Sequence, residues 1–168
     1  GRFIAFLDSD DLWKKRKLEK QIKFMKSNNY AFTYTRYNKI NINREIIGIV
    51  SSGKLEVSYK DMLKTNHIGC LTAILDIHIL GKKILMPNLR KRQDHGLWLI
   101  VLKDIERAYC LNETLASYRI RNDSISKNIF SNFYYQWMLY RQVESLRLTH
   151  SLYYIICYIF YGIIKNIR

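Results

Sequence analysis

Three carboxylates stand together near the start of the chain, directly after a short apolar run. They are Asp8, Asp10 and Asp11, in the stretch FLDSDDLW. Two carboxylates separated by one residue in a turn can share a hard cation such as Mg²⁺ or Mn²⁺, which takes oxygen ligands and completes its shell with water and substrate phosphates. Asp8 and Asp10 are therefore candidate metal ligands, and the cation implies a phosphate-bearing substrate.

The charge balance also indicates an anionic partner. The 168 residues include 28 Lys plus Arg and 14 Asp plus Glu, a net charge of +14. This surplus is typical of proteins that bind nucleic acid, anionic lipid or a phosphorylated substrate, and a solvated basic surface is the alternative explanation. The hydrophobic fraction of 48% predicts a globular domain rather than a disordered chain.

The elements that must position these side chains alternate between strands and helices. We expect a buried strand over residues 3–8, then a helix over 12–29 with Leu18, Ile22 and Met25 as its apolar stripe. Asp11 is the expected N-cap of that helix. Further elements are strands at 31–40, 44–50 and 70–77, a short helix at 58–66 capped by Ser58, an apolar helix after Asp94, and two short strands within 108–121.

This order of elements predicts a mixed α/β sheet flanked by helices. In open sheets of that kind, ligands bind beyond the carboxyl ends of the strands. Asp8 and Asp10 lie where the first predicted strand ends, so we expect their carboxylates to face such a crevice.

Residues 129–168 differ in character from the rest of the chain. The stretch SLYYIICYIFYGII has no charged residue and falls short of the ~20 apolar residues that span a bilayer. It is rich in aromatic residues and is followed by Lys165 and Arg168, which is typical of a helix at a membrane interface. A buried helix that packs on the domain is the alternative.

The first segment, GRFIAFLDSDDLWKKRKLEKQIKFM, resembles the central segment of family 2 glycosyltransferases of the GT-A fold, which carry a D-x-D motif after a sheet strand. SYKDMLKTNHIGCLTAILD, MPNLRKRQDHGLWLIVLK and LNETLASYRIRNDSIS resemble later segments of the family, in family order. The resemblance covers about residues 1–127. It implies a partial GT-A sheet that lacks the N-terminal nucleotide-binding strands, with 1–128 as the metal and acceptor side of the catalytic domain and 129–168 as C-terminal helices.

The resemblance also implies roles for individual residues. Asp8 would lie near the donor ribose, and Asp10 would chelate Mg²⁺ or Mn²⁺. Asp94 matches the general base, although it follows Gln93 where the family usually has Glu. Arg119 and Arg121 would bind substrate, because they match, with Ser124 and Ser126, a loop that closes over the diphosphate.

The expected function is therefore that of an inverting glycosyltransferase. It would move a sugar from a nucleotide-sugar donor to a polysaccharide or lipid-linked acceptor, peripherally at the cytoplasmic face of a bacterial membrane. A metal-dependent nucleotidyltransferase is one alternative, but it does not predict the Asp94 segment. A basic nucleic-acid-binding module is another, but it needs its cations gathered on one face beside exposed aromatics. No nucleic acid is expected, and a chain without the upstream strands is itself a candidate for an inactive product.

Overall fold

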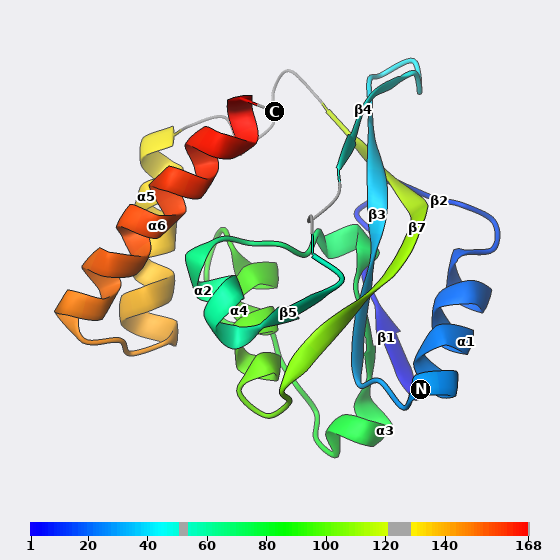
Figure 1. Ribbon diagram of the computed structural model, residues 1–168, viewed down its shortest axis with the longest axis horizontal. Helices are drawn as coiled ribbons and strands as arrows, with labels where there is room; N and C mark the ends of the chain where they lie inside the picture. The colour runs from blue at the N-terminus through cyan, green and yellow to red at the C-terminus, as the bar shows by residue number, and fades with distance from the viewer. Residues whose placement is uncertain (51–53, 121–128, 168) are drawn as a thin grey trace. The chain divides into compact units, whose positions relative to one another are not determined.

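The computed structural model describes the backbone of residues 1–50, 54–120 and 129–167 (Figure 1). The chain forms two compact units. The sheet unit contains Gly1–Val57, Ile68–Lys83 and Ile105–Ser124, and the helical unit contains Ser58–His67, Ile84–Asp104 and Ile125–Arg168. The domain boundary expected near residue 128 stays a prediction.

The sheet unit is a mixed α/β sheet with helices, as predicted. Its main strand order is β1-β6-β3-β7-β2, with β4 beside β3 and β5 beside β7. The strands β3 and β7 run parallel, whereas β1, β2 and β4 pair antiparallel with their neighbours. The elements are β1 (Phe3–Ala5), β2 (Leu12–Trp13), α1 (Lys17–Asn28), β3 (Phe32–Ile40), β4 (Ile46–Val50), β5 (Glu56–Ser58), a 3₁₀ turn (Cys70–Thr72), β6 (Ile74–Asp76), α3 (Ile77–Leu80) and β7 (Arg107–Arg119).

The helix α1 begins later than the sequence predicts and turns a different face inward. Leu12 and Trp13 form a short strand that pairs with Ser117 and Ala116 of β7, so the expected helix start and the Asp11 cap are wrong. Backbone N–H and C=O groups need hydrogen-bond partners, and at Leu12 and Trp13 the backbone of β7 supplies them in place of a helical turn. The buried residues of α1 are Lys17, Gln21 and Met25.

Leu18, the first residue of the predicted apolar stripe of α1, is instead exposed. The helix α1 packs against β3, β6 and β7. At positions 17 and 21, one residue before the predicted Leu18 and Ile22, the polar side chains of Lys17 and Gln21 face inward. Those side chains are tolerated inside because they hydrogen-bond to one another, Lys17 Nζ to Gln21 Oε1 at 2.8 Å.

The last strand of the sheet unit is continuous, whereas the sequence predicts two short strands around a polar turn. β7 pairs with β3 along most of its length, and its register shifts between Leu111 and Thr114, opposite Thr35 and Arg36. The polar pair Asn112 and Glu113 therefore forms a bulge rather than a turn. The first strand, β1, is also shorter than predicted, and it is half-buried rather than buried on both faces.

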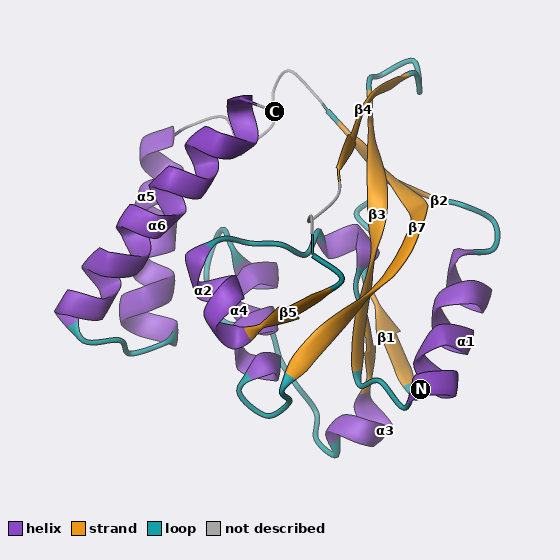
Figure 2. Cartoon of the chain, in the orientation of Figure 1, coloured by secondary structure: helices purple, strands orange, loops and turns teal. Residues whose placement is uncertain are grey.

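The helical unit consists of helices apart from Ser58 of β5 and the connecting loops (Figure 2). The prediction for α2 is confirmed, since Ser58 and Asp61 form a reciprocal capping box. The helix α4 is buried almost all round, with Trp98 and Leu99 fully enclosed. The helices are α2 (Tyr59–Lys64), α4 (Gln93–Leu102), α5 (Ile129–Met138), a π-helical segment (Leu139–Val143) and α6 (Leu148–Ile167).

The helix α6 carries an apolar surface on its outer side. Its exposed large apolar side chains have exposed fractions from 39% to 66%. No helix within the described part of the chain is both long and apolar enough to cross a membrane. These exposed residues are Leu148, Leu152, Tyr153, Ile156, Ile159, Phe160 and Ile163.

Candidate functional site

The acidic turn, residues 8–11, lies at the carboxyl ends of two parallel strands. β3 ends at Ile40 and β7 ends at Arg119, and these two residues pair with each other in the register of the strands. The turn runs directly into β2, whose Leu12 pairs with Ser117 of β7. The acidic turn is therefore at the edge of the sheet where open α/β sheets bind their ligands.

One arginine ties the acidic turn to its surroundings. Arg119 donates from Nε to the carbonyl of Asp10 at 2.8 Å, and its backbone N–H donates to Oδ1 of Asp11 at 2.9 Å. Its Nη1 donates to the carbonyls of Ile42 at 3.1 Å and Asn41 at 3.3 Å. Between described residues, these side-chain bonds of Arg119 go to backbone carbonyls of the protein.

Asp11 is the buried member of the acidic turn. Its residue is 5% exposed, while Asp8 is exposed and Asp10 is half-buried. Burial raises the pKa of Asp11 to about 6, the hydrogen bond from the Arg119 N–H opposes this, and the nearby charges of Asp10 and Asp8 raise it further. In the described structure Oδ2 of Asp11 is buried and accepts no hydrogen bond. The acidic turn therefore holds closely spaced negative charge.

The donor set of the turn fits a hard divalent cation. No group of three or more His, Cys, Asp or Glu side chains in the described part of the chain is placed to hold a metal ion. Asp8 and Asp10 would therefore supply at most two carboxylates, and water and substrate phosphates would supply the rest. That is the usual coordination of Mg²⁺ in phosphate-handling sites, and carboxylate oxygens suit Mn²⁺ equally.

Asp94 belongs to the helical unit, near the beginning of α4. The N-cap of α4 is Arg92, in the left-handed region at φ 68°, so Asp94 is a first-turn residue and not a cap. Its Oδ2 accepts a hydrogen bond from Nδ2 of Asn66 at 3.3 Å. The carboxylate is half-buried, and the helix dipole favours its anionic form.

The packing of α4 explains why Asp94 is held where it is. The neighbouring His95 is fully buried, with Nε2 2.7 Å from the carbonyl of Met62 in α2. The next residue must be glycine, because a Cβ at Gly96 would lie 2.6 Å from Cγ of Pro87. The start of α4 is thus locked against the rest of the helical unit.

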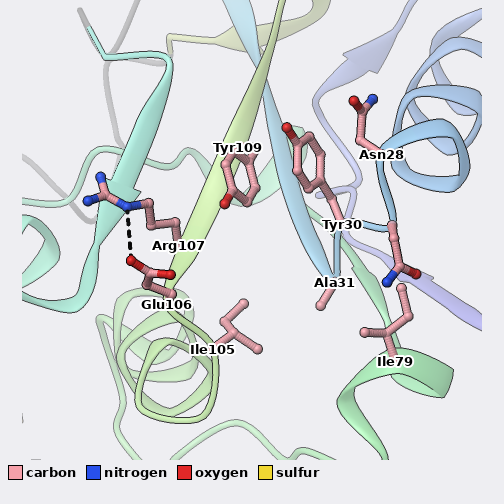
Figure 3. A pocket seen from close by; sticks show the side chains of 9 residues that line it. Asn28, Tyr30, Ala31, Ile79, Ile105, Glu106, Arg107 and Tyr109 are labelled. Carbon is pink, nitrogen blue, oxygen red and sulfur yellow. Dashed lines mark ion pairs between the residues drawn. The ribbon is translucent and has the colours of Figure 1, made fainter.

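A separate cavity lies at the other ends of the same strands. It has a volume of about 420 Å³ and includes Tyr30, just before β3, and Tyr109 of β7 (Figure 3). Their rings stack with centroids 3.7 Å apart. Because β3 and β7 are parallel, this cavity opens at their amino ends, opposite the edge that carries the acidic turn. It is therefore not part of the candidate site.

The structure places Asp8, Asp10 and Arg119 together in the sheet unit and Asp94 in the helical unit. Arg121, Ser124 and Ser126 lie outside the described residues. Sequence reasoning missed Asn66 as a partner of Asp94, and it missed the attachment of Asp11 to Arg119. No local pattern indicates either contact, since the bonded residues are 28 and 108 positions apart.

The comparison with known families concerns the first half of the chain. The family described as glycosyl transferase family 2 matches residues 1–86, which contain the acidic turn and the sheet as far as α3. The chain belongs to glycosyltransferase family 2. Members of this family generally use a divalent cation, in agreement with the donor set of the turn.

Two curated relatives extend the likeness over nearly the whole chain. TuaG of Bacillus subtilis (strain 168), a glycosyltransferase assigned to teichuronic acid biosynthesis, is 42% identical over 90% of this chain. WfgD of Escherichia coli, a UDP-Glc:alpha-D-GlcNAc-diphosphoundecaprenol beta-1,3-glucosyltransferase, is 40% identical over 99% of it. The chain spans 60% of the length of TuaG and 64% of that of WfgD.

A solved structure supports the GT-A fold. Staphylococcus aureus TarS 1-349, crystallised with UDP-GlcNAc, superposes with a TM-score of 0.60 at 16% identity, over 95% of this chain and 48% of TarS. The predicted fold class, a GT-A type mixed sheet with C-terminal helices, is therefore confirmed. Membership of family 2 also favours glycosyl transfer over the nucleotidyltransferase and nucleic-acid-binding alternatives.

Proposed function

We propose that this protein acts as an inverting glycosyltransferase of bacterial surface-polysaccharide synthesis. The observation that carries the proposal is the acidic turn at the carboxyl ends of β3 and β7, in a chain of family 2. The donor would be a nucleotide sugar. UDP-sugars are the first candidates to test, because WfgD is named for UDP-Glc and TarS was crystallised with UDP-GlcNAc. The acceptor would be a glycan or a lipid-linked sugar.

In this proposal the acidic turn binds the donor and Asp94 handles the proton. Asp10, with Asp8, would hold Mg²⁺ or Mn²⁺, which when bound supplies positive charge against the leaving diphosphate. The acceptor hydroxyl attacks the anomeric carbon as the bond from that carbon to the diphosphate oxygen breaks. The hydroxyl proton passes to the Asp94 carboxylate, which Asn66 orients through its hydrogen bond.

The departure of Gln93 from the usual acidic residue has a chemical consequence in this scheme. A neutral neighbour leaves Asp94 without an adjacent like charge, and such a charge would raise the affinity of Asp94 for a proton. Position in the first turn of α4 further stabilises the anion. Both features favour the anion, which is the form that can take the proton of the acceptor hydroxyl.

We also propose that the C-terminal segment, residues 129–168, touches the membrane peripherally at its cytoplasmic face. The support is the exposed apolar surface of α6 together with the absence of any Asp or Glu from Leu148–Ile167. Arg141 and Arg147 precede the helix and are exposed, so its beginning matches an anionic lipid surface. A lipid-linked acceptor would be reached from that position.

The test is a donor assay on the full-length protein. Hydrolysis and transfer of UDP-, GDP- and dTDP-sugars are measured with Mn²⁺ for the wild type, Asp10→Asn and Asp94→Asn, with Asp104→Asn as the exposed acid-to-amide control. We expect turnover of one donor that Asp10→Asn abolishes together with its Mn²⁺ dependence. Asp94→Asn should lower kcat for transfer by about 10²–10⁴-fold with the donor KM unchanged. A folded protein that turns over none of these donors would contradict the proposal.

A further inference from the structure

The acidic turn brings three carboxylates close together in the chain. Asp8, Asp10 and Asp11 lie within four consecutive residues, and a backbone bond from Asp11 N to Asp8 O at 3.1 Å closes the turn. Like charges at this spacing repel one another and favour an open, solvated chain. Something outside the turn must therefore keep its carboxylates in place.

The guanidinium of Arg119 connects the acidic turn to a second segment of backbone. It places a permanent positive charge against the turn and bonds the carbonyl of Asp10, the residue proposed to hold the cation. On its other side, Nη1 reaches the carbonyls of Asn41 and Ile42, in the turn between β3 and β4. A planar group with several fixed donors can bridge two backbone segments in this way, and a lysine cannot.

The β3–β4 turn is itself built to present those carbonyls. Oδ1 of Asn41 accepts from the backbone N–H groups of Asn43 at 2.9 Å and Glu45 at 3.0 Å. Arg44 adopts the left-handed region at φ 66°, and its N–H donates to the Asn41 carbonyl at 3.1 Å. The Asn41 side chain thus fixes a tight turn, in which the carbonyls of Asn41 and Ile42 accept hydrogen bonds from Arg119.

We propose that Arg119 is a positioning residue of the donor site, which locks the acidic turn to the β3–β4 turn so that Asp8 and Asp10 are held ready for the cation. In this role the guanidinium acts through the Asp10 carbonyl, and the backbone N–H of Arg119 holds the Asp11 carboxylate beside it. The proposal rests on the proposed function only for the identity of the bound cation and donor. The connection that Arg119 makes between the acidic turn and the β3–β4 turn, which we call the lock, is a property of the fold.

The experiment compares the full-length wild type with Arg119→Gln, Asn41→Ala and the double variant. The control is Arg107→Gln, at the other end of the same strand, whose Nη1 pairs with the Glu56 carboxylate at 2.6 Å. Two quantities are measured without nucleotide: amide hydrogen exchange of residues 8–12, and Mn²⁺ affinity by electron paramagnetic resonance of the free ion. Omitting the nucleotide removes any contribution from contact with the diphosphate.

We expect Arg119→Gln to speed exchange in residues 8–12 and to weaken Mn²⁺ binding by about 10–100-fold, the usual loss when a partner of a metal ligand is removed. Asn41→Ala should act in the same direction and add little in the Arg119→Gln background, because both disturb one connection. Arg107→Gln should change neither quantity.

Two results would separate the lock from the proposed function. Unchanged exchange in both Arg119→Gln and Asn41→Ala would overturn the lock, whatever the metal does. Faster exchange in these variants, in a protein whose wild type binds no Mn²⁺, would uphold the lock and overturn the proposed metal site instead.

Discussion

Lys17 places an ammonium group inside the sheet unit, and its cost should be measurable as a pH dependence of stability. The residue is 0% exposed, its Nζ lies 2.8 Å from Oε1 of Gln21, and the same nitrogen sits 4.5 Å from the centroid of the Trp13 ring. Burial lowers the pKa of Lys17 from its ordinary value of 10.5 to about 8, because the charged form loses its hydration. The folded protein therefore releases this proton more readily than the unfolded chain does.

The direction of the effect follows from proton counting. Below pH 8 both states carry the proton, and the folded state bears the full cost of the buried charge. Between pH 8 and pH 10.5 the unfolded state binds more protons, so the free energy of unfolding rises with pH. This group should contribute a gain of about 2–3 kcal/mol between pH 7 and pH 10, at about 1.4 kcal/mol for each unit of pKa difference.

The assay is urea unfolding at pH 7, 8, 9 and 10 for the wild type, Lys17→Met and Lys23→Met. Lys23 is an exposed lysine of the same helix and controls for the loss of a surface charge. Lys17→Met leaves Oε1 of Gln21 without its donor, which costs about 1–3 kcal/mol at every pH. The slope, rather than the absolute stability, is therefore decisive. If Lys17→Met keeps the full rise seen in the wild type and Lys23→Met, the buried ammonium is not its source.

Two further predictions concern the helical unit. Gly96→Ala should destabilise the protein by about 1–3 kcal/mol, because the new Cβ would contact the Pro87 ring. Gly162→Ala in α6 has open space around its Cβ and should stabilise the protein by about 0.5–1 kcal/mol. Thermal unfolding of both variants checks this, and equal shifts of the melting temperature would contradict it. Ile156→Glu, at a side chain 66% exposed on α6, should weaken binding to anionic phospholipid vesicles by at least about tenfold in a flotation assay. Asn88→Glu adds the same charge at an exposed loop position, and an equal loss there would refute insertion of α6.

Several features of this protein follow from residues that are close together in the sequence. The capping box of Ser58 and Asp61 needs only a spacing of three residues, and it forms as predicted. The alternating aromatic stretch forms β3, and the apolar run after Asp94 forms α4. The D-x-D spacing and its place after a strand were likewise readable, because a turn of four residues is a local structure.

Other features depend on a choice between local structures of similar stability. Leu12 and Trp13 are equally suited to a helix or a strand, and pairing with β7 decides for the strand. Asn112 and Glu113 would make a good turn, but parallel pairing with β3 on both sides of them holds β7 in one piece with a bulge. Periodicity alone cannot decide these cases, because the competing backbone partners are far away in the sequence.

By itself, then, the sequence determined which groups are the candidates for the proposed chemistry: two carboxylates in the acidic turn and one at the start of α4. Only the tertiary structure decided what holds them. Arg119 reaches Asp10 across 109 positions, and Asn66 reaches Asp94 across 28. The physical reason is that a carboxylate's chemistry is carried by its own atoms, whereas its orientation depends on hydrogen bonds and burial that exist only after distant segments have packed.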